Sequence, residues 1–457
     1  MKTTRLLFPL LLALAIVSGA RAETRSVIAA SLSSGTLSNP TEASQTRLVG
    51  KLTVPGATLL RVPLSHVALG RASQVRFVSL ADGQSQTLDA AQLEMWARTS
   101  ALFNGDTVRV EVILAPGDEG VAVQVREVFT YSHRTDPARP NDDCCGGGIA
   151  TRTLCGPDNR AASTDNRVGR LTGGCTGWLT SNGAVLTAGH CGIGGGSIFE
   201  VNIPASLPNG GIVASAVQDQ FPVIAGSNTV VNGGTGNDWQ VFRIGQNNLL
   251  ESAHVRHGFF RMTPGVPGAG TVMRITGCGI DNTPAGSQPG VCGNFDSAGN
   301  CTHFGLNAQN QTLQTSTGGF AGLAGSALTY SVDTEPANSG SPIIWESTGF
   351  TIGIHTAGGC TASGGANNGT SFGLATLGNA IALIPGPNTR YLDRVRAPDN
   401  VEDGTIFQPH DTLVEAVNVV PVGGQISAVK GSYPVTNLTI TKAMTISAPV
   451  GDATFGN

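Results

Sequence analysis

Short segments with alternating apolar and polar residues dominate the first part of the chain, and glycine or proline separates them. Alternation with a period of two predicts half-buried β-strands. We expect such strands at residues 46–52, 74–80, 107–114 and 121–131. Residues 88–99 instead place apolar side chains at helical spacing after Asp89, which predicts one short helix. The pattern indicates a small antiparallel sandwich over residues 23–135.

A second series of short apolar runs begins near Leu171, with glycine-rich turns between the runs. The runs cover residues 175–180, 184–187, 199–203, 238–244, 271–276, 327–331, 342–345 and 350–355. Because no long helical pattern interrupts them, they predict an all-β barrel or a pair of barrels. An insert at residues 278–301, rich in Asn, Gly and Pro, is expected to form a surface loop.

The pattern changes again after Asp393. Short apolar segments, separated by glycine and proline, occur at residues 414–419, 424–429, 438–441 and 445–448. They resemble the beginning of a stacked-strand repeat, such as the first rung of a right-handed β-helix. Since one rung cannot bury its own apolar face, we expect either that the repeat continues or that these strands pack on the preceding domain.

The composition suits many strands better than long helices, because the 457 residues include 62 Gly and 24 Pro and only 13% are charged. A chain of this length is expected to form two or three domains. The net charge of -4 is small, and no run of Lys or Arg occurs. The sequence therefore argues against nucleic acid and anionic membranes as partners.

The N-terminus has the pattern of a secretory signal peptide. Basic residues occur within residues 1–5, an apolar run covers residues 6–17, and small residues end at Ala22. This order predicts cleavage after Ala22 and export of the protein. The apolar run is too short to span a bilayer, and the sequence contains no other long apolar run. We expect a secreted protein and take the monomer as its simplest state.

Export makes disulfides the expected state of the nine cysteines, which are Cys144, Cys145, Cys155, Cys175, Cys191, Cys278, Cys292, Cys301 and Cys360. The odd number leaves one cysteine without a partner inside the chain. The spacings do not suit zinc, because no His-x-x-x-His segment accompanies the adjacent pair Cys144 and Cys145. Residues 136–167, rich in Asp, Pro, Gly and Cys, are expected to form a linker fixed by disulfides.

The segment from Cys175 to Cys191 contains the most specific chemical pattern. Two short apolar strands joined by Ser-Asn-Gly predict a β-hairpin, and the cysteine at each end can bridge its base. Such a hairpin fixes His190 rigidly beside Cys191. A positioned imidazole can accept a proton near neutral pH, so His190 is a candidate general base, although a histidine on a sheet is more often structural.

Residues 333–342 contain a candidate nucleophile. Ser339 lies between small, turn-forming residues, which would place its hydroxyl at a tight bend beside backbone N–H groups. The same Asn-Ser-Gly-Ser pattern also describes an ordinary loop, so the partners of Ser339 decide between the two interpretations.

Asp238 is the candidate for the acid that orients His190. It follows a Gly-Asn pair and begins an apolar strand, so its carboxylate would be half-buried. The structural alternative is that Asp238 caps a turn after Asn237. Two other aspartates, Asp219 and Asp281, are less well placed rivals.

Three motifs occur in the order His, Asp, Ser: Thr-Ala-Gly-His-Cys at 187–191, Gly-Asn-Asp-Trp at 236–239 and Asn-Ser-Gly-Ser-Pro at 338–342. On these motifs the sequence resembles the chymotrypsin-like (trypsin-like) serine peptidases over residues 168–397. Within that superfamily it is similar to the secreted bacterial branch that contains glutamyl and lysyl endopeptidases. The resemblance implies two antiparallel barrels with the site in the cleft between them, and hydrolysis of protein or peptide substrates without a metal or organic cofactor.

By this resemblance, Ser339 is the nucleophile, His190 is the general base and then acid, and Asp238 orients the imidazole. The N–H groups of Ala337 and Ser339 would form the oxyanion hole. The family normally has glycine at the position of Ala337, and a misplaced donor there would lower the rate on the order of a hundredfold. Asn338 also implies that no carboxylate at that position pairs with a newly cut N-terminus.

The resemblance leaves two interpretations of the primary specificity pocket open. Asp333 lies six positions before Ser339, where trypsin-like members select Lys or Arg. In glutamyl members, the positions of Thr334 and of His355, which precedes Thr356, line the pocket and bind an acidic side chain. A histidine and a hydroxyl facing the pocket favour an acidic side chain, whereas an exposed Asp333 would favour a basic one. We favour the acidic preference; the structural alternative for His355 is a strand residue hydrogen-bonded to backbone.

The disulfide expectations differ in their basis. The hairpin predicts the pair Cys175–Cys191. By the resemblance, Cys360 pairs with Cys155 or with one of the adjacent cysteines of the linker. The insert is expected to be closed by a disulfide between two of its three cysteines, Cys278, Cys292 and Cys301.

Together these expectations describe a secreted serine endopeptidase with an all-β, chymotrypsin-like double β-barrel, an N-terminal β-sandwich and a short C-terminal β appendage. The expected boundaries are 1–22 for the signal peptide, 23–135 for the sandwich, 136–167 for the linker, 168–397 for the protease domain and 398–457 for the appendage. The alternative is a protease-like binding or surface protein whose catalysis is weakened by Ala337. A carbohydrate-active β-helix protein is a third interpretation, which depends on the appendage alone.

Overall fold

The computed structural model describes residues 24–132, 153–208, 210–281, 294–295, 301–303, 307–361, 364–395 and 397–456. The expected signal peptide therefore lies outside the described residues, as do Cys144, Cys145 and Cys292. Within the described residues no helix is long and apolar enough to cross a membrane.

The N-terminal unit consists of two antiparallel sheets around one apolar core. One sheet has the order β1 (Thr24–Ser33), β9 (Ala122–Ser132), β3 (Leu59–Arg61) and β7 (Phe103–Asn104), with β4 (His66–Ala68) paired to β9. The other has the order β2 (Gln45–Thr53), β8 (Thr107–Leu114), β5 (Gln74–Ser79) and β6 (Ser85–Leu88). Side chains from both sheets, including Leu60 and Phe77, share the core. This arrangement is the sandwich that the alternating pattern predicts.

The short helix predicted after Asp89 is present as α1 (Ala90–Met95). The side chain of Asp89 accepts a hydrogen bond from the N–H of Gln92 at 2.8 Å, and the Gln92 side chain accepts from the N–H of Asp89 at 3.0 Å. These reciprocal bonds form a capping box, which explains why the helix begins at this position.

A seven-stranded antiparallel sheet follows in the chain. Its order is β15 (Gln220–Pro222), β14 (Ile198–Glu200), β11 (Val168–Leu171), β12 (Cys175–Leu179), β13 (Val185–Thr187), β17 (Asp238–Phe242) and β16 (Thr229–Asn232). Two 3-10 turns, η1 (Gly189–Cys191) and η2 (Val217–Asp219), and helix α2 (Ala253–His257) accompany it. Among the described residues its edge strands β15 and β16 do not pair with each other, so it is a half-barrel, and together with the barrel described next it confirms the predicted all-β architecture.

The second sheet of this region closes into a six-stranded barrel. Its order is β10 (Ala161–Ala162), β21 (Gln314–Ala324), β18 (Val272–Gly277), β23 (Pro342–Trp345), β24 (Phe350–Ala357), β25 (Asn367–Ser371) and β22 (Ala327–Tyr330), and β22 also pairs with β21. Helix α3 (Ala375–Ala382) packs Leu377 and Ile381 into the core that contains Trp178 and Trp239. The expected insert contributes only a separate ladder of β19 (Asn294–Phe295) and β20 (Cys301–His303) to the described residues.

The C-terminal unit is built on parallel strands. Strands β26 (Thr389–Leu392), β27 (Gln425–Ala428) and β29 (Thr445–Ser447) pair in that order, and β28 (Gly431–Tyr433) pairs with β30 (Ala453–Phe455). Parallel pairing of successive short strands is the arrangement of stacked rungs. The apolar side chains of Val429 and Val450 pack in the core of the half-barrel, so the unit is partly covered by the preceding domain.

Two strand predictions in this unit are wrong. Residues 414–419 belong to helix α4 (Leu413–Val419), whose first turn is capped by Thr412 through a bond from the N–H of Glu415 at 3.3 Å. Its apolar residues Leu413, Ala416 and Val417 are buried at helical spacing, which the short apolar run concealed. Residues 438–441 form no strand.

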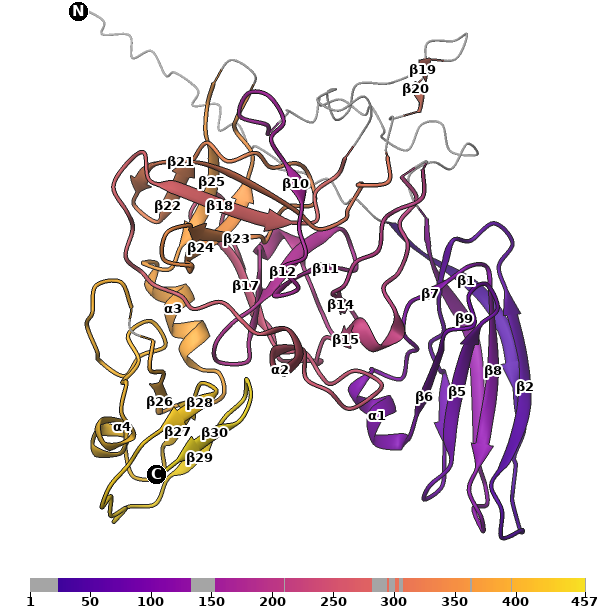
Figure 1. Ribbon diagram of the computed structural model, residues 1–457. Coiled ribbons are helices and arrows are strands. Elements are labelled where there is room, and N and C mark those ends of the chain that lie inside the picture. The colour runs from indigo at the N-terminus through magenta and orange to yellow at the C-terminus, as the bar shows by residue number, and fades with distance from the viewer. Residues whose placement is uncertain are drawn as a thin grey trace, which may run out of the picture.

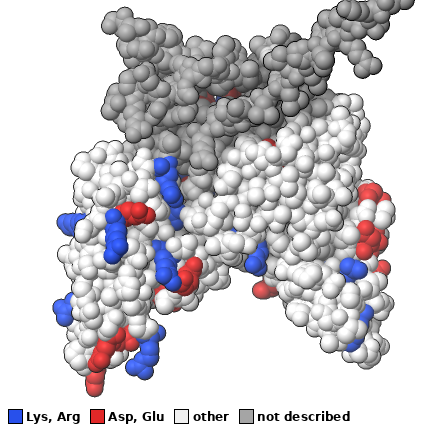
Figure 2. All heavy atoms as spheres, turned by 180° about the vertical axis from the view of Figure 1, so that it is seen from behind, with Lys and Arg blue, Asp and Glu red and all other residues white. Residues whose placement is uncertain are grey.

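The three units lie side by side, with the two sheets of the central region between the N-terminal sandwich and the C-terminal parallel strands (Figure 1). On the face in Figure 2, positive and negative side chains are intermixed on the two lower lobes, and the surface between them is largely uncharged. This view agrees with the weak net charge and shows no field of one sign that would attract a polyanion.

Candidate active site

His190 and Asp238 are joined by two hydrogen bonds. The Nδ1 atom of His190 lies 2.6 Å from Oδ2 of Asp238, and the backbone N–H of His190 donates to Oδ1 at 2.9 Å. Because a carboxylate only accepts, the proton of a neutral His190 lies on Nδ1 and its Nε2 keeps a free lone pair. The side chains are 24% and 8% exposed respectively, so the imidazole reaches solvent while the carboxylate is nearly buried. This arrangement can accept a proton at Nε2.

The local fold explains why Asp238 is held in place. Asp238 is the first residue of β17, and its N–H donates to the hydroxyl of Thr370 at 3.1 Å while that hydroxyl donates to the Asp238 carbonyl at 2.9 Å. A Cβ at Gly189 would lie 1.9 Å from the carbonyl oxygen of Val231 and 2.9 Å from Oδ1 of Asp238. Only glycine therefore fits immediately before His190.

Ser339 follows a tight turn over residues 335–338. The N–H of Asn338 donates to the carbonyl of Glu335 at 3.0 Å, and Ala337 has a φ of 77°. Because Pro336 fixes a negative φ at the second position, a positive φ at the third position defines a type II turn. This turn needs a positive φ at Ala337, which glycine would adopt at lower cost.

The peptide between Pro336 and Ala337 is fixed on one side by the neighbouring loop. The carbonyl of Pro336 accepts from the N–H of Ile280 at 2.9 Å, and the carbonyl of Ala337 accepts from the hydroxyl of Thr176 at 2.9 Å. In a trans peptide the N–H points opposite to the C=O, so the N–H of Ala337 is directed away from Ile280. Among the described residues no group accepts a hydrogen bond from the N–H of Ala337 or of Ser339. Both donors are therefore available to an oxyanion.

The backbone on either side of the Ser339 hydroxyl is held by three hydrogen bonds. The Ser339 carbonyl accepts from the N–H of Thr176 at 2.9 Å, the N–H of Gly340 donates to the His355 carbonyl at 2.8 Å, and the N–H of His355 donates to Ser341 at 2.8 Å. Gly340 has a φ of 95°, and a Cβ there would lie 2.1 Å from the Thr176 carbonyl oxygen. Glycine after Ser339 is therefore required by both backbone conformation and space.

The Ser339 side chain is half-buried, and no described residue makes a hydrogen bond to its Oγ. The closest fixed connection to the histidine is through Cys191, whose Sγ lies 3.9 Å from the Ser339 carbonyl oxygen. Bonds between a nucleophile and its base are often loose in the absence of substrate. His190 is thus hydrogen-bonded to Asp238, and Ser339 lies beside Cys191, the residue after His190.

The rival aspartates have other partners. Asp219 lies 3.3 Å from a guanidinium nitrogen of Arg256. Asp281 lies 3.7 Å from Arg160, and its carboxylate accepts from the Asn307 side chain at 3.1 Å. Neither contacts His190, so Asp238 alone of the three is hydrogen-bonded to the candidate base.

Asp333 does not present a free carboxylate. One oxygen accepts from the N–H of Cys155 at 2.6 Å and the other accepts from the N–H of Asn159 at 2.9 Å. The residue is 3% exposed. Both oxygens of Asp333 are therefore hydrogen-bonded to the segment from Thr153 to Asn159. The carboxylate is not free to pair with a basic substrate side chain.

Thr334 is fully buried beside the same segment. Its hydroxyl contacts the hydroxyl of Thr153 at 3.1 Å and accepts from the Asn367 amide at 3.0 Å. The Asn367 amide also donates to the Thr153 carbonyl at 2.6 Å and to the Val332 carbonyl at 2.8 Å. Thr153 and Asn367 were not identified in the sequence, because no local pattern links them to Thr334.

His355 is 3% exposed and its Nδ1 lies 2.7 Å from the hydroxyl oxygen of Tyr330. That hydroxyl donates to the Asn368 carbonyl at 3.0 Å, so Nδ1 must be the donor in the first bond and Nε2 carries no proton in the neutral ring. Burial, with the nearby charge of His190 as the second cause, lowers the pKa of His355 to about 3. The hydroxyl of Thr356 is buried without a hydrogen-bond partner among the described residues.

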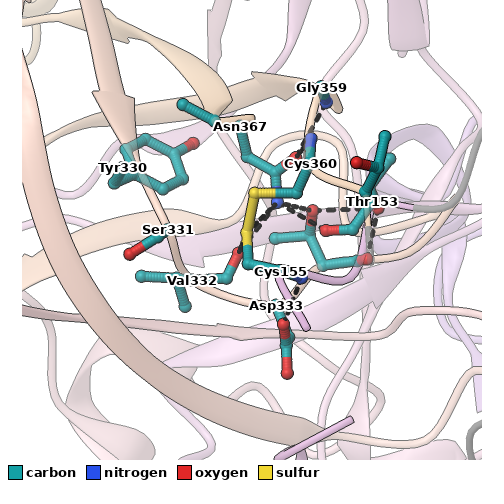
Figure 3. The surroundings of a disulfide bond; sticks show 12 residues. Thr153, Cys155, Tyr330, Ser331, Val332, Asp333, Gly359, Cys360 and Asn367 are labelled. Atoms are coloured by element: carbon teal, nitrogen blue, oxygen red, sulfur yellow. Dashed lines mark hydrogen bonds between the residues drawn. A yellow bond between two sulfur atoms is a disulfide. The ribbon is translucent and has the colours of Figure 1, made fainter. Parts of the chain in front are cut away.

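The disulfides agree with the expectations in part. Cys175 and Cys191 form the predicted bond across the hairpin, and Cys360 pairs with Cys155, one of the two alternatives (Figure 3). Cys278 is free and buried, and burial raises the pKa of its thiol to about 12. Cys278 therefore takes no part in closing the insert, and the other two cysteines of the insert lie outside the described side chains, so the expected disulfide between two of the three stays a prediction.

Two groups of side chains bring three potential metal ligands together within the described residues. The first contains His190 and the disulfide partners Cys175 and Cys191, whose sulfur atoms are used in the covalent bond. The second contains Glu402, His410 and Glu415 in the C-terminal unit, where Glu415 also bonds the helix cap Thr412.

Residues 158–372 match the family described as Trypsin. A glutamyl endopeptidase structure is 18% identical, with a TM-score of 0.34, and covers 50% of this chain and 97% of its own. A mutant of human heparin binding protein (CAP37) is 15% identical, with a TM-score of 0.36, and covers 50% of this chain and 96% of its own.

A search of the curated proteins gives no match. The family match covers the half-barrel, the closed barrel and all three candidate catalytic residues. Residues 158–372 therefore form a chymotrypsin-like serine peptidase domain of the trypsin family.

Proposed function

We propose that the protein is a secreted serine endopeptidase that hydrolyses peptide bonds through an acyl-enzyme on Ser339. The observation that carries the proposal is the pair of bonds from His190 to Asp238, at 2.6 and 2.9 Å, which leaves Nε2 of the imidazole free to accept a proton. The fixed turn before Ser339, with two N–H groups that have no acceptor among the described residues, supports the same chemistry.

Each group has a defined role in the reaction. Nε2 of His190 removes the proton of the Ser339 hydroxyl as Oγ bonds the carbonyl carbon, and the carbonyl electron pair moves onto oxygen. The N–H groups of Ala337 and Ser339 donate to that oxyanion. The C–N bond then breaks, and the imidazolium gives its proton to the leaving amine. Water repeats these steps to release the acid and restore Ser339, while Asp238 keeps the imidazole oriented.

An acidic side chain before the scissile bond is the preference that we propose. Two backbone donors occupy both oxygens of the buried Asp333, so its carboxylate is not available to select Lys or Arg. His355 is fixed behind the nucleophile by its bonds with Gly340 and Ser341. Because Nε2 of His355 is unprotonated in the neutral ring, binding a carboxylate there requires the uptake of one proton.

This link between proton uptake by His355 and carboxylate binding gives a direct test of the acidic preference of the pocket. The ratio of kcat/KM for Glu over Gln before the scissile bond should fall as the pH rises from about 5.5 to 8, because the protonated form of His355 becomes rarer. A His355→Gln variant should remove the pH dependence of that ratio. A ratio below one at every pH would exclude the acidic preference and leave the catalytic assignment intact.

Export is part of the proposal and depends on the sequence. The basic start, the apolar run and the small residues before Ala22 support cleavage there. The two disulfides of the described residues support an oxidising compartment. Mass analysis of the N-terminus of protein recovered outside the producing cell should begin with Glu23.

The nucleophile is tested with a fluorophosphonate, which reacts only with an activated serine. The native protein and a Ser331→Ala control, which removes an exposed serine of the same domain, should be labelled at Ser339 as located by peptide mapping. Ser339→Ala should not be labelled. Labelling that persists in the Ser339→Ala variant would assign the reaction to a different residue.

A binding or surface protein derived from a peptidase is the second candidate. It is favoured by the absence of any hydrogen bond to Ser339 Oγ among the described residues and by the non-glycine residue Ala337 at a positive φ. This candidate predicts that only an Ala337→Gly variant reacts with the fluorophosphonate. Equal labelling of the native protein would exclude it.

A further inference from the structure

A cavity of about 440 Å³ lies between the N-terminal sandwich and the half-barrel. The sandwich contributes Arg25, Ala97, Thr99, Phe129 and Tyr131, and the half-barrel contributes Thr172, Gly173 and most of the segment 191–197. Neither unit forms this cavity alone. Its location makes the sandwich a part of the surface that surrounds the candidate active site.

The half-barrel wall of the cavity includes Cys191, the residue that follows His190. Cys191 follows His190 directly and lies 3.9 Å, at its sulfur, from the carbonyl oxygen of Ser339. A histidine that passes its proton to the leaving amine must lie on the side of the scissile bond where that amine departs. The cavity therefore adjoins the part of the cleft that holds the substrate residues after the scissile bond.

The sandwich wall offers a positive charge. The guanidinium of Arg25 lies 4.3 Å from the centroid of the Phe129 ring, and Arg25 is exposed. Among the described residues no carboxylate lies within ion-pair distance of Arg25. The ring holds the guanidinium in position, and its charge stays available for an incoming anion.

The facing wall offers backbone donors. The segment from Gly192 to Gly196 is partly exposed except at Ile193, and the N–H groups of Gly195 and Gly196 have no acceptor among the described residues. Successive glycine N–H groups without an acceptor are suited to a carboxylate. The cavity thus combines one cation and free N–H donors.

The two walls are fixed relative to each other by buried polar contacts. Gln220 accepts from the N–H of Leu102 at 2.8 Å and donates to the Leu102 carbonyl at 2.8 Å. The side chain of Asn104 accepts from the N–H of Ala214 at 2.8 Å, and the guanidinium of the buried Arg61 donates to the Gly196 carbonyl. The cavity is therefore a preorganised site rather than a gap between mobile units.

We propose that this cavity is a substrate subsite that binds an acidic side chain located after the scissile bond, with Arg25 as its specificity-determining residue. The proposal depends on the proposed peptidase function and assigns a substrate-binding role to the N-terminal sandwich. A carboxylate fits because it matches the guanidinium and the glycine N–H donors at once.

The test compares peptides that differ only by Asp or Asn at the first to fourth positions after the scissile bond. At one or more of these positions the native protein should cleave the Asp peptide with a kcat/KM about 5- to 10-fold higher, a typical effect of one charge-assisted hydrogen bond. Arg25→Gln should abolish this difference and Arg25→Glu should reverse it. Arg47→Gln, which changes an exposed arginine of the other sheet, should have no effect.

A substrate whose leaving group is an aromatic amine lacks the residues after the scissile bond. Its kcat/KM should be the same for the native protein and for Arg25→Gln. Loss of activity on this substrate in Arg25→Gln, or equal cleavage of all Asp and Asn peptides by the native protein, would overturn the subsite.

Binding to the Ser339→Ala variant separates this proposal from the peptidase assignment. Fluorescence anisotropy should show that a labelled Asp peptide binds about 5-fold more tightly than its Asn counterpart, and that Arg25→Gln removes the difference. That result supports the subsite even if the native protein hydrolyses nothing. Equal affinities for the two peptides would exclude it.

Discussion

Single residues of the site show how a departure from a family pattern can keep the required backbone. Ala337 occupies a position that the turn needs at positive φ, and its φ is 77°. Pro336 before it and the bonds from Ile280 and Thr176 fix the turn. The strain of a non-glycine residue here, about 1 kcal/mol, is opposed by the smaller entropy loss of alanine on folding.

We therefore expect Ala337→Gly to change the free energy of unfolding by less than about 0.5 kcal/mol and to label with a fluorophosphonate at least as fast as the native protein. Ala337→Val should label on the order of a hundredfold more slowly, because a β-branched residue resists this φ and displaces the N–H donor. Second-order labelling rates measure both effects. Equal rates for Val and Gly would show that the Ala337 N–H is not a donor to the oxyanion.

Two buried histidines predict the response to acid. Burial lowers the pKa of His254 to about 4, and its Nε2 donates to the Ala184 carbonyl at 3.0 Å. His355 is shifted in the same direction, to about 3. Between these values and about 6.5 the unfolded chain binds protons that the native protein does not, so stability falls as the pH falls through this window.

Each histidine should contribute up to about 3 kcal/mol of destabilisation between pH 7 and pH 4. Urea unfolding across this range measures it. A His254→Gln variant can still bond the Ala184 carbonyl but cannot titrate, so its stability should depend less steeply on pH than that of the native protein. Identical pH slopes for the two proteins would contradict the buried neutral state of His254.

At the scale of elements, alternating patterns predicted the structure well. The strand expected at residues 107–114 is β8 (Thr107–Leu114), and helix α1 begins directly after Asp89 as expected. Helix α4 was predicted as a strand. Its seven residues span only about two helical turns, so the apolar pattern of one buried helical face cannot be told from that of a buried strand. The open edge of the half-barrel depends on pairing between distant strands, which local patterns do not encode.

The residues of the candidate site were also predictable from the sequence only in part. His190, Asp238 and Ser339 were identified because each lies in a short motif of its own. Asn367 and Thr153 contact the predicted pocket from positions 33 and 181 residues away from Thr334, so no spacing in the sequence marks them. Cys155, two residues after Thr153, forms a disulfide with Cys360 across a separation of 205 residues.

This disulfide should matter more for stability than the one in the hairpin. In the chain-entropy description, cross-linking a separation of 205 residues constrains the unfolded state more than one of 16 residues, by roughly 2 kcal/mol. Replacing Cys155 and Cys360 by Ala should therefore lower the free energy of unfolding by more than replacing Cys175 and Cys191. Denaturant unfolding of the two double variants measures the difference, and an equal or reversed order would contradict this expectation.

At the scale of the whole molecule, the sandwich and the half-barrel share one apolar core. Residues of the half-barrel region, including Ile198 and Val217, belong to the apolar core of the sandwich. The side chain of Gln220 pairs with both backbone groups of Leu102 across the interface. The N-terminal unit is therefore docked through a continuous core rather than attached by the linker alone.

Gln220→Leu should lower the free energy of unfolding by about 2–4 kcal/mol, because it leaves the buried N–H and C=O of Leu102 without partners. The exposed neighbour Gln218 provides a matched control, and Gln218→Leu should change stability by less than about 0.5 kcal/mol. Urea unfolding monitored by tryptophan fluorescence reports on both sides, since Trp96 lies in the sandwich and Trp178 in the half-barrel. A single unaffected transition in Gln220→Leu would show that the two units fold independently of this contact.

The most direct measurement of the central claim is cleavage of a mixed peptide library by the native protein and by Ser339→Ala, with new N-termini identified by mass spectrometry. The account predicts new termini only with the native protein, enriched after acidic residues and with acidic residues among the positions that follow. Absence of any Ser339-dependent cleavage, in protein that retains both disulfides and the native fold, would contradict it.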